Sequence, residues 1–302
     1  MHTSYIKTLP PFPARAVDSH KGDFGLGVLL GGSRGMSGAI SLAGRAALAT
    51  GAGLVRLLVP DCILDTVAGH ATEWMTAPLA SDRKGRVSLS AWDAIVPHLT
   101  SATALGVGPG LGRSLGLTAL MRRLFQWQND HTPTKPVVLD ADALNAIADW
   151  KRLHGGVFPS ARFPIILTPH PGEFARLRWE PPPRDPQGRL EAAVRFAKET
   201  GTILVLKGHG TVITDGVRHT VNPSGNPGMA TGGSGDVLTG ILVALLAQRM
   251  PPYDAAVLGV FLHGLAGDLA AQEYGPVLTA SRIIESLPKA IRYCVQAQER
   301  GA

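Results

Sequence analysis

The sequence predicts an α/β fold with a mainly parallel central sheet and helices on both faces. Three observations support this. Several runs of Val, Ile and Leu are continuously apolar, as in strands buried on both faces. They alternate along the chain with segments of helical spacing, and glycine-rich or polar motifs follow them where each run ends. We expect the 302 residues to form one domain, 1–302, with 1–18 as an N-terminal lead-in.

The first half of the chain contributes three predicted strands and one helix. Residues 24–32 (FGLGVLLGG) form a buried strand that ends in glycines. Residues 37–53 are small and apolar at helical spacing and end at Gly51 and Gly53, typical stop signals. Residues 54–60 (LVRLLVP) are a second strand, and residues 102–112 (ATALGVGPGLG) give a strand followed by a glycine loop.

The second half continues the alternation of strands and helices. The predicted elements are a strand entering a helix (135–148), a strand ending in a loop (164–173), a helix (191–201), a strand–turn–strand pair (202–216) and three helices (237–248, 255–272 and 281–298).

Composition excludes several classes of protein. With 45% hydrophobic and 17% charged residues, the chain has the apolar content of a globular protein. The net charge of +6 is spread without a Lys/Arg block, so we expect no nucleic-acid partner; a generally basic surface and a basic cleft for phosphorylated ligands both remain open. Cys62 and Cys294 lack the spacing of a disulfide framework or a zinc site.

The longest apolar stretches are interrupted by polar residues, which favours core helices over membrane spans. The N-terminal segment has no apolar region of the signal-peptide kind. We therefore expect a cytoplasmic enzyme without a membrane partner.

The segment NPGMATGGSGDVLTG, residues 226–240, places glycines and one acid, Asp236, before an apolar helix. Successive glycine amides at a helix N-terminus can bind a phosphate. Asp236 is either the N-cap of that helix or a base beside the bound phosphate, and the surrounding glycines favour the second interpretation. A P-loop of the GxxxxGK[ST] type is absent from the sequence, so any nucleotide site needs another geometry.

Two further motifs follow predicted strands. In KGHGT, Lys207 could contact phosphate while the amides of residues 207–211 line a nucleotide, although a plain β-turn is an equal alternative. In TPHPGEF, two prolines stiffen a loop that carries His170 and Glu173. Glu173 could hold a hydrated Mg²⁺, or both side chains could simply be solvated.

The remaining polar candidates are less specific. Asp140 and Asp142 in DADALN could serve a metal or ribose hydroxyls, or cap the next helix. His263, together with Asp268 in the same predicted helix, is expected to satisfy hydrogen bonds of the core. His20 and Lys21 precede the first strand and could cover the site.

Together, the motifs resemble the ADP/ATP-dependent NAD(P)H-hydrate dehydratases, repair enzymes of the ribokinase-like superfamily. The resemblance runs from about residue 19 to about residue 288. It rests on motifs in the family's order: HKGDFG, GGSRGMSGA, GVGPGLG, DADALN, ILTPHPGEF, VLKGHGT and NPGMATGGSGDVLTG. It implies that the chain removes water from the S form of 6-hydroxylated NADH or NADPH, with ADP as co-substrate and AMP and phosphate as products.

The resemblance also implies roles for residues. Asp236 is the catalytic base, and the amides of Gly233, Ser234 and Gly235 form an anion hole. The other implied contacts are an adenine-nucleotide site of Lys207, Gly208, His209, Gly210, Thr211 and Gly235, a dinucleotide site of Ala39, Gly110, His170 and Asp236, and Glu173 as the residue that places Mg²⁺ through water.

Relatives of this family are often tetramers, so a homo-oligomer is expected. Some relatives carry an N-terminal epimerase domain, whereas about twenty residues precede the first motif here; the resemblance is to the stand-alone dehydratase, with a separate NAD(P)H-hydrate epimerase as its partner. Two alternatives remain. They are a thiazole- or pyridoxal-type kinase, which would share the fold and Asp236, and a non-catalytic nucleotide-binding regulator, which would need no base.

Overall fold

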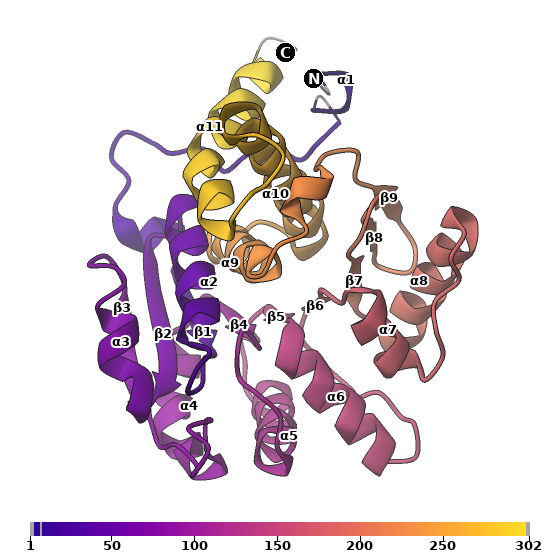
Figure 1. Ribbon diagram of the computed structural model, residues 1–302. Coiled ribbons are helices and arrows are strands. Elements are labelled where there is room, and N and C mark those ends of the chain that lie inside the picture. Colours follow the sequence, from indigo (N-terminus) through magenta and orange to yellow (C-terminus); the bar gives the residue numbers. More distant parts are fainter. Residues whose placement is uncertain (1–2, 7, 300–302) are drawn as a thin grey trace.

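A computed structural model describes residues 3–6 and 8–299. Its strands form one nine-stranded sheet in the order β3-β2-β1-β4-β5-β6-β7-β8-β9 (Figure 1). The strands are β1 (Leu26–Leu30), β2 (Leu54–Pro60), β3 (Met75–Leu79), β4 (Ala104–Val107), β5 (Val137–Leu139), β6 (Ile165–Leu167), β7 (Ile203–Leu206), β8 (Val212–Thr214) and β9 (His219–Val221). Strands β1 to β7 pair in parallel, and β8 and β9 are antiparallel additions at one edge. The predicted mainly parallel sheet is confirmed.

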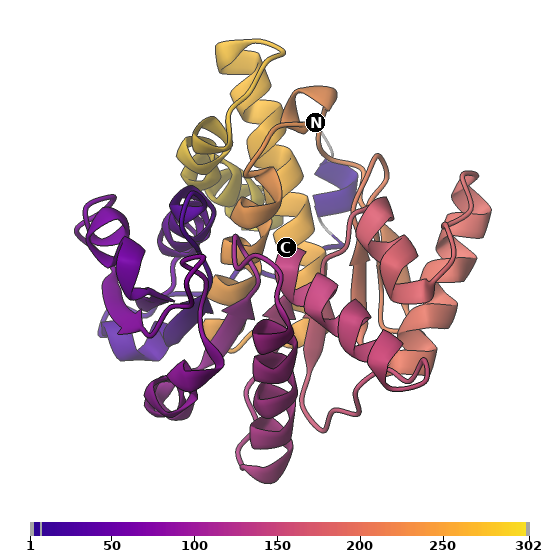
Figure 2. The same cartoon turned by 60° about the horizontal axis from the view of Figure 1, so that its bottom comes forward.

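Helices cover both faces of this sheet, as predicted (Figures 1 and 2). One layer contains α2 (Ser37–Ala49), α3 (Leu64–Ala68), α9 (Ser234–Ala247), α10 (Pro252–Tyr274) and α11 (Ala280–Glu299). The other contains α4 (Trp92–Ser101), α5 (Leu115–Asp130), α6 (Ala141–Leu153), α7 (Pro171–Arg178) and α8 (Pro186–Thr200). A short helix, α1 (Thr3–Ile6), packs against α11.

Successive residues of each strand enter the two layers in turn, because side chains of a strand alternate between its faces. In β1, Leu29 packs with the α9 layer, whereas Val28 and Leu30 pack with the α5 layer. Both faces are therefore apolar, which is why the strands read as continuous Val, Ile and Leu runs.

Some elements lie outside the sequence-based assignment. Strand β3 contains Pro78, and β9 has exposed residues at both ends; both are short strands near or at the sheet edges, with little apolar pattern. The prediction that a loop carries Glu173 is wrong, because α7 begins at Pro171 and Glu173 lies in the first turn of that helix. Proline is well tolerated at this first helical position.

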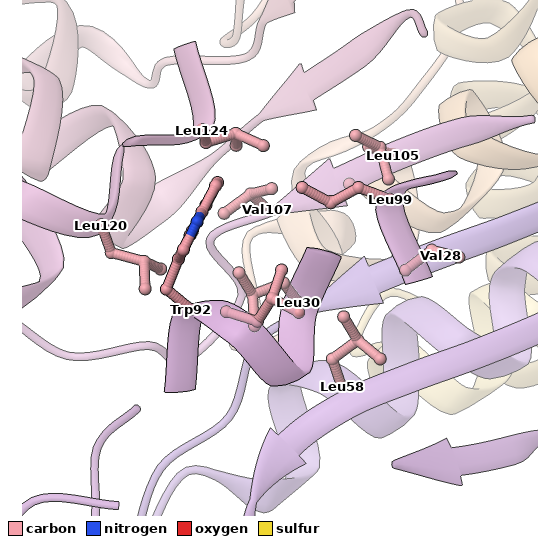
Figure 3. Close-up of a pocket in the computed structure, with 11 residues that line it drawn as sticks. Val28, Leu30, Leu58, Trp92, Leu99, Leu105, Val107, Leu120 and Leu124 are labelled. Carbon is pink, nitrogen blue, oxygen red and sulfur yellow. The ribbon is translucent and has the colours of Figure 1, made fainter. Parts of the chain in front are cut away.

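A cavity of about 10 Å³ lies beneath β1 and β4. Its lining is apolar, with Trp92 and Leu120 opposite Leu30 and Val107 (Figure 3). Because this volume is only about that of one water-sized probe, the cavity is a packing defect of the core and too small for a ligand.

Helix α10 is long and apolar enough to cross a membrane, but 72% of its most apolar stretch is buried inside the molecule. It packs between α9 and α11. Its apolar character is thus explained by packing, as the sequence analysis expects.

The order of the strands reverses direction at β1, which has β2 on one side and β4 on the other. In open α/β sheets, ligands bind outside the carboxyl ends of the strands near such a point. Helix α9 runs against the strands: Gly235 in its first turn adjoins Lys207 and Asp140, and Ala247 at its end adjoins Gly25 before β1. Its N-terminus therefore lies at the carboxyl edge of the sheet.

Candidate functional site

The first turn of α9 forms the centre of the site. Its N-cap is Gly233, whose φ of +88° lies in the left-handed region that favours glycine. No side chain caps the helix, and the first amides of a helix have no partner within it. The amides of Gly235 and Asp236 make no hydrogen bond within residues 3–6 and 8–299. They are free to bind an anion, with the helix dipole in support.

Asp236 is the third residue of α9 and not its N-cap, so the capping interpretation is wrong. Its carboxylate is partly buried and has no hydrogen-bond partner within the described part of the chain. Burial, followed by the negative charge of Asp140, raises the pKa of Asp236 to about 7. A carboxylate with this pKa is well matched to accept a proton near neutral pH.

Lys207 follows β7, and its side chain is 21% exposed. Its ammonium Nζ donates to Asp140 Oδ1 at 2.9 Å. Burial alone would lower the pKa of Lys207, but the charges of Asp140 and Glu173 outweigh it, so this pKa lies above its ordinary value. The site therefore holds a permanent cation beside the first turn of α9.

Asp140 follows β5 and is 1% exposed. It occupies the N-cap position of α6 without capping it; instead, its Oδ2 accepts a hydrogen bond of 2.9 Å from the Thr239 hydroxyl. Both carboxylate oxygens thus have protein partners, and of the roles that the sequence left open for this residue, the helix cap is wrong. Thr239 is a residue that the sequence analysis missed, although it lies one helical turn after Asp236 and on the same side of α9.

The turn between β7 and β8 contains the predicted nucleotide residues Lys207, Gly208, His209, Gly210 and Thr211. Two of its carbonyl oxygens accept hydrogen bonds from side chains: the Thr211 hydroxyl donates to Gly208 O at 3.0 Å, and Arg189 Nη1 donates to His209 O at 3.1 Å. Arg189 from α8 is a second residue that the sequence analysis missed. Its Nε and Nη2 are buried without a hydrogen-bond partner within the described residues.

Ala39 and Gly110, both predicted to contact the dinucleotide, lie next to each other. A Cβ on Gly110 would be 3.1 Å from the Ala39 Cβ and 2.7 Å from Met36 O. Asp142 holds this glycine loop, because its Oδ2 accepts from the Gly112 amide at 2.7 Å. The second acid of DADALN thus fixes a loop at the switch point of the sheet.

His170 and Glu173 form a capping box at the start of α7. His170 Nδ1 accepts from the amides of Gly172 and Glu173, and Glu173 Oε2 accepts from the His170 amide at 2.9 Å. The His170 side chain is 52% exposed and that of Glu173 is 7% exposed. Because Glu173 contributes to the pKa values of both Lys207 and Asp236, its charge acts on the same site.

Two residues of α10 contact the first residue of α9 and the loop that precedes it. Ser234 Oγ and His263 Nε2 are 3.3 Å apart, and burial, followed by the charge of Lys207, lowers the pKa of His263 to about 4. Asp268 accepts hydrogen bonds from the Gly225 amide and the Asn226 side chain, both at 2.9 Å. The expected structural role of His263 and Asp268 agrees with these contacts.

His20 and Lys21 do not lie near this site, so the expectation that they cover it is wrong. Lys21 belongs to a short 3-10 helix, η1 (Lys21–Phe24), whose backbone approaches Gly53 just before β2. Leu54 N donates to Gly25 O in the same region. These residues are at the amino edge of the sheet, opposite the N-terminus of α9.

With this geometry established, comparison with known proteins identifies the family. The sequence model of the NAD(P)H-hydrate dehydratases matches residues 27–289. The chain belongs to this family. The resemblance stated from the motifs is confirmed, and the family's activity, removal of water from a hydrated nicotinamide nucleotide, is that of a lyase.

Curated relatives are similar over most of this chain. It is 42% identical over 283 residues to the bifunctional NAD(P)H-hydrate repair enzyme Nnr of Moorella thermoacetica, covering 93% of the chain and 52% of that protein. It is 37% identical over 264 residues to the enzyme of the same name from Escherichia coli, covering 86% of the chain and 46% of that protein. The chain spans about half the length of these curated relatives.

Solved structures share the ribokinase-like fold. The ADP/ATP-dependent NAD(P)H-hydrate dehydratase of Bacillus subtilis, co-crystallised with ATP and Mg²⁺, matches with a TM-score of 0.80 and 29% identity, covering 97% of each chain. A ribokinase-like superfamily protein of Enterococcus faecalis matches with a TM-score of 0.79 and 26% identity, covering 98% of this chain and 96% of that one. A hydroxyethylthiazole kinase of Pyrococcus horikoshii, at 16% identity and a TM-score of 0.55, covering 85% of this chain and 96% of that one, shares the fold alone.

Proposed function

We propose that this dehydratase restores NADH and NADPH from the S form of their 6-hydroxylated derivatives and consumes ADP in doing so. The observation that carries the proposal is the Asp236 carboxylate, partly buried, without a hydrogen-bond partner among the described residues and with a pKa of about 7, in the first turn of α9. The family match and the relative named as ADP/ATP-dependent support the same reaction.

The chemistry follows from the poor leaving ability of hydroxide. Asp236 accepts the proton of the C6 hydroxyl, and the hydroxyl oxygen attacks the terminal phosphorus of ADP, which releases AMP. The ring nitrogen then expels phosphate from C6, and loss of a proton from C5 restores the dihydropyridine. The water removed from the nucleotide thus leaves as part of inorganic phosphate.

The amides of Gly233, Ser234 and Gly235 would bind the transferred phosphoryl group, because helix-terminal amides are preorganised for negative charge. The Lys207 ammonium lies beside Gly235 and supports this role. Gly208, His209, Gly210 and Thr211 would line the adenine nucleotide. Ala39, Gly110 and His170 would contact the hydrated dinucleotide.

We propose Mg²⁺ as the metal, held mainly by nucleotide phosphates and water, where it would neutralise charge on the phosphates. Among residues 3–6 and 8–299, no group of three or more His, Cys, Asp or Glu side chains is arranged to hold a metal. Glu173 already accepts from the His170 amide, which suits contact through a water molecule better than direct ligation. The B. subtilis relative was crystallised with ATP and Mg²⁺.

We further propose a cytoplasmic homo-oligomer, with the tetramer as its form, which acts together with a separate NAD(P)H-hydrate epimerase. The curated relatives of about twice this length are named bifunctional repair enzymes, which supports a second, coupled activity.

The test is to mix the purified protein with hydrated NADH, Mg²⁺ and either ADP or ATP, and to follow the absorbance of reduced nicotinamide. We expect recovery of NADH with ADP. No recovery with either nucleotide, together with phosphorylation of a thiazole alcohol or of pyridoxal, would establish the kinase alternative instead.

A further inference from the structure

We propose that Thr239 is a positioning residue for the reaction: its hydroxyl holds Asp140, so that Asp140 keeps the Lys207 ammonium at the first turn of α9. The inference rests on the proposed function, because Lys207 then faces the transferred phosphoryl group. It assigns a role to Asp140, which sequence reasoning left open between metal, ribose and helix cap.

The three side chains, from three elements, form one linear chain of hydrogen bonds with Asp140 in the middle. The Thr239 hydroxyl of α9 donates to Asp140 Oδ2 at 2.9 Å, and Lys207 Nζ after β7 donates to Asp140 Oδ1 at 2.9 Å. Thr239 is 0% and Asp140 1% exposed. With both oxygens occupied, Asp140 serves as an anchor and leaves Asp236 as the free carboxylate.

The main chain also fixes Asp140. Ala141, the next residue, has a φ of +48°, a left-handed backbone conformation that residues other than glycine rarely adopt. On the other side, a Cβ on Gly108 would lie 1.8 Å from Asp140 O, so only glycine permits this approach. The strained backbone at Ala141 and the close approach of Gly108 together fix the main chain of Asp140, and with it the position of the Asp140 carboxylate.

The chain of contacts ends at the atoms that would meet the phosphate. A Cβ on Gly235 would lie 3.2 Å from Lys207 Nζ, so the ammonium reaches the first turn of α9. Thr239 lies one turn after Asp236 on that helix. Helix α9 therefore carries both Asp236 and Thr239, the residue that holds Asp140. The position of the Lys207 ammonium is coupled in this way to the position of Asp236.

Without the Thr239 hydroxyl, Asp140 Oδ2 loses its donor in a buried site, and the Asp140–Lys207 pair can rotate. A shift of about 1 Å at a reacting centre costs on the order of 100-fold in rate. We therefore expect Thr239→Val to lower kcat by about tenfold to 100-fold, whereas Thr239→Ser, which keeps the hydroxyl, retains most of it.

Thr50→Val is the matched control. Thr50 is also 0% exposed, and its hydroxyl donates to the backbone oxygen of Ala46 at 2.8 Å, near the end of α2. We expect Thr50→Val to lower the Tm as Thr239→Val does while kcat stays at the wild-type value. A wild-type kcat in Thr239→Val, or equal losses in Thr239→Val and Thr239→Ser, would overturn the inference.

Asp140→Asn provides a second variant if Thr239→Val folds poorly. The neutral amide cannot form the ion pair in which Lys207 Nζ donates to Asp140 Oδ1 at 2.9 Å, so Asp140→Asn should weaken ADP binding as Thr239→Val does. Wild-type ADP affinity in a folded Asp140→Asn would contradict the proposal.

Calorimetric titration with ADP separates failure of this inference from failure of the proposed function. Displacement of the ammonium should weaken ADP binding in Thr239→Val but not in Thr239→Ser, whether or not hydrated NADH is turned over. If the wild type does not restore NADH yet this affinity pattern is found, the reaction is wrong and the positioning role stands. If the wild type restores NADH but Thr239→Val binds ADP as tightly as the wild type does, the proposed reaction stands and the positioning role is wrong.

Discussion

The ammonium of Lys207 lies 2.9 Å from a carboxylate oxygen of Asp140, although strand β6 separates the strands that precede them. The two residues are therefore joined across two strand spacings, about 10 Å. This ion pair brings a cation from the carboxyl end of β7 toward α9. It leaves Asp236 as the carboxylate of this site that has no protein donor among the described residues.

The first prediction concerns Asp236→Asn. The amide keeps the size of the side chain but cannot accept the proton of the substrate hydroxyl, so kcat should fall by about 10²- to 10⁴-fold. Calorimetry should show ADP affinity within a few-fold of wild type. Asp254→Asn is the matched control, since Asp254 is also the third residue of its helix, α10, which begins soon after α9 ends at the amino edge. Equal loss of stability and activity in Asp236→Asn would contradict a role as the base.

The second prediction is the pH dependence of activity. Burial and Asp140 raise the pKa of Asp236 to about 7, and the base is active only when ionised. The kcat/KM value should therefore rise with pH, reach half of its plateau near pH 7 and fall about tenfold per pH unit well below that. A limb near pH 4, the range of an ordinary carboxyl, would show that another group limits the reaction.

The third prediction is the effect of the same group on stability. The folded protein holds a proton on Asp236 up to about pH 7, whereas the unfolded chain loses it near pH 4. The contribution of Asp236 to folding is thus complete below about pH 4 and decreases as the pH rises to about 7. Asp236→Asn, which cannot ionise, should have a higher Tm than wild type at pH 8 and an equal one at pH 4, measured by thermal unfolding. A Tm difference that is constant with pH would contradict the raised pKa.

The fourth prediction is that Gly235→Ala separates stability from activity. Alanine is the better helix former by about 1 kcal/mol, but its Cβ would lie 3.2 Å from Lys207 Nζ and 3.7 Å from Asp140 Oδ2. We expect an unchanged or higher Tm together with a loss of kcat and ADP affinity of about tenfold or more. Gly116→Ala, at the same second position of α5 and with no atom closer than 3.6 Å, should keep wild-type kinetics. Unchanged kinetics in Gly235→Ala would remove Lys207 from the phosphate site.

The fifth prediction distinguishes the two substrate loops. Asp142→Ala frees the Gly112 amide and should loosen the loop that carries Gly110. The KM for hydrated NADH should rise about tenfold or more, by the size of a lost part-buried hydrogen bond to a charged group, while the KM for ADP changes little. Asp149→Ala, which removes the exposed pair with Arg113, should change neither, because exposed ion pairs contribute little. A rise in the KM for ADP alone would contradict this assignment of the loops.

Much of the fold could be predicted because its signals are local. Apolar runs gave the central strands, and motifs such as DADALN and VLKGHGT were placed correctly at the carboxyl ends of β5 and β7. Short strands such as β9 bury too little apolar surface to leave a pattern. The start of α7 was read as a loop because prolines on both sides of His170 resemble those of an irregular segment.

The site was less accessible to sequence reasoning because its contacts are long-range. Thr239 and Asp140 are 99 residues apart, and Lys207 and Asp140 are 67 residues apart, so neither pairing can be read from spacing. Capping by Asp140, one of the roles that the sequence left open, is a local preference that tertiary contacts override. In the same way, the glycines before α9 indicated an anion site, but the freedom of Asp236 became visible only when its neighbours were placed.

The antiparallel end of the sheet has a consequence for how nucleotide preference could change. After the carboxyl ends of β4, β5 and β6 the chain enters a helix, but after β7 it turns back directly into β8, and the register of Leu206 with Val212 leaves five residues for the turn. Parallel strands need a long crossover, whereas a hairpin needs only this turn. In the proposed function, residues 207–211 line the adenine nucleotide. Exchange of these five residues between relatives would leave the order of the strands untouched, so under that proposal this hairpin is the segment to transplant when co-substrate choice is engineered.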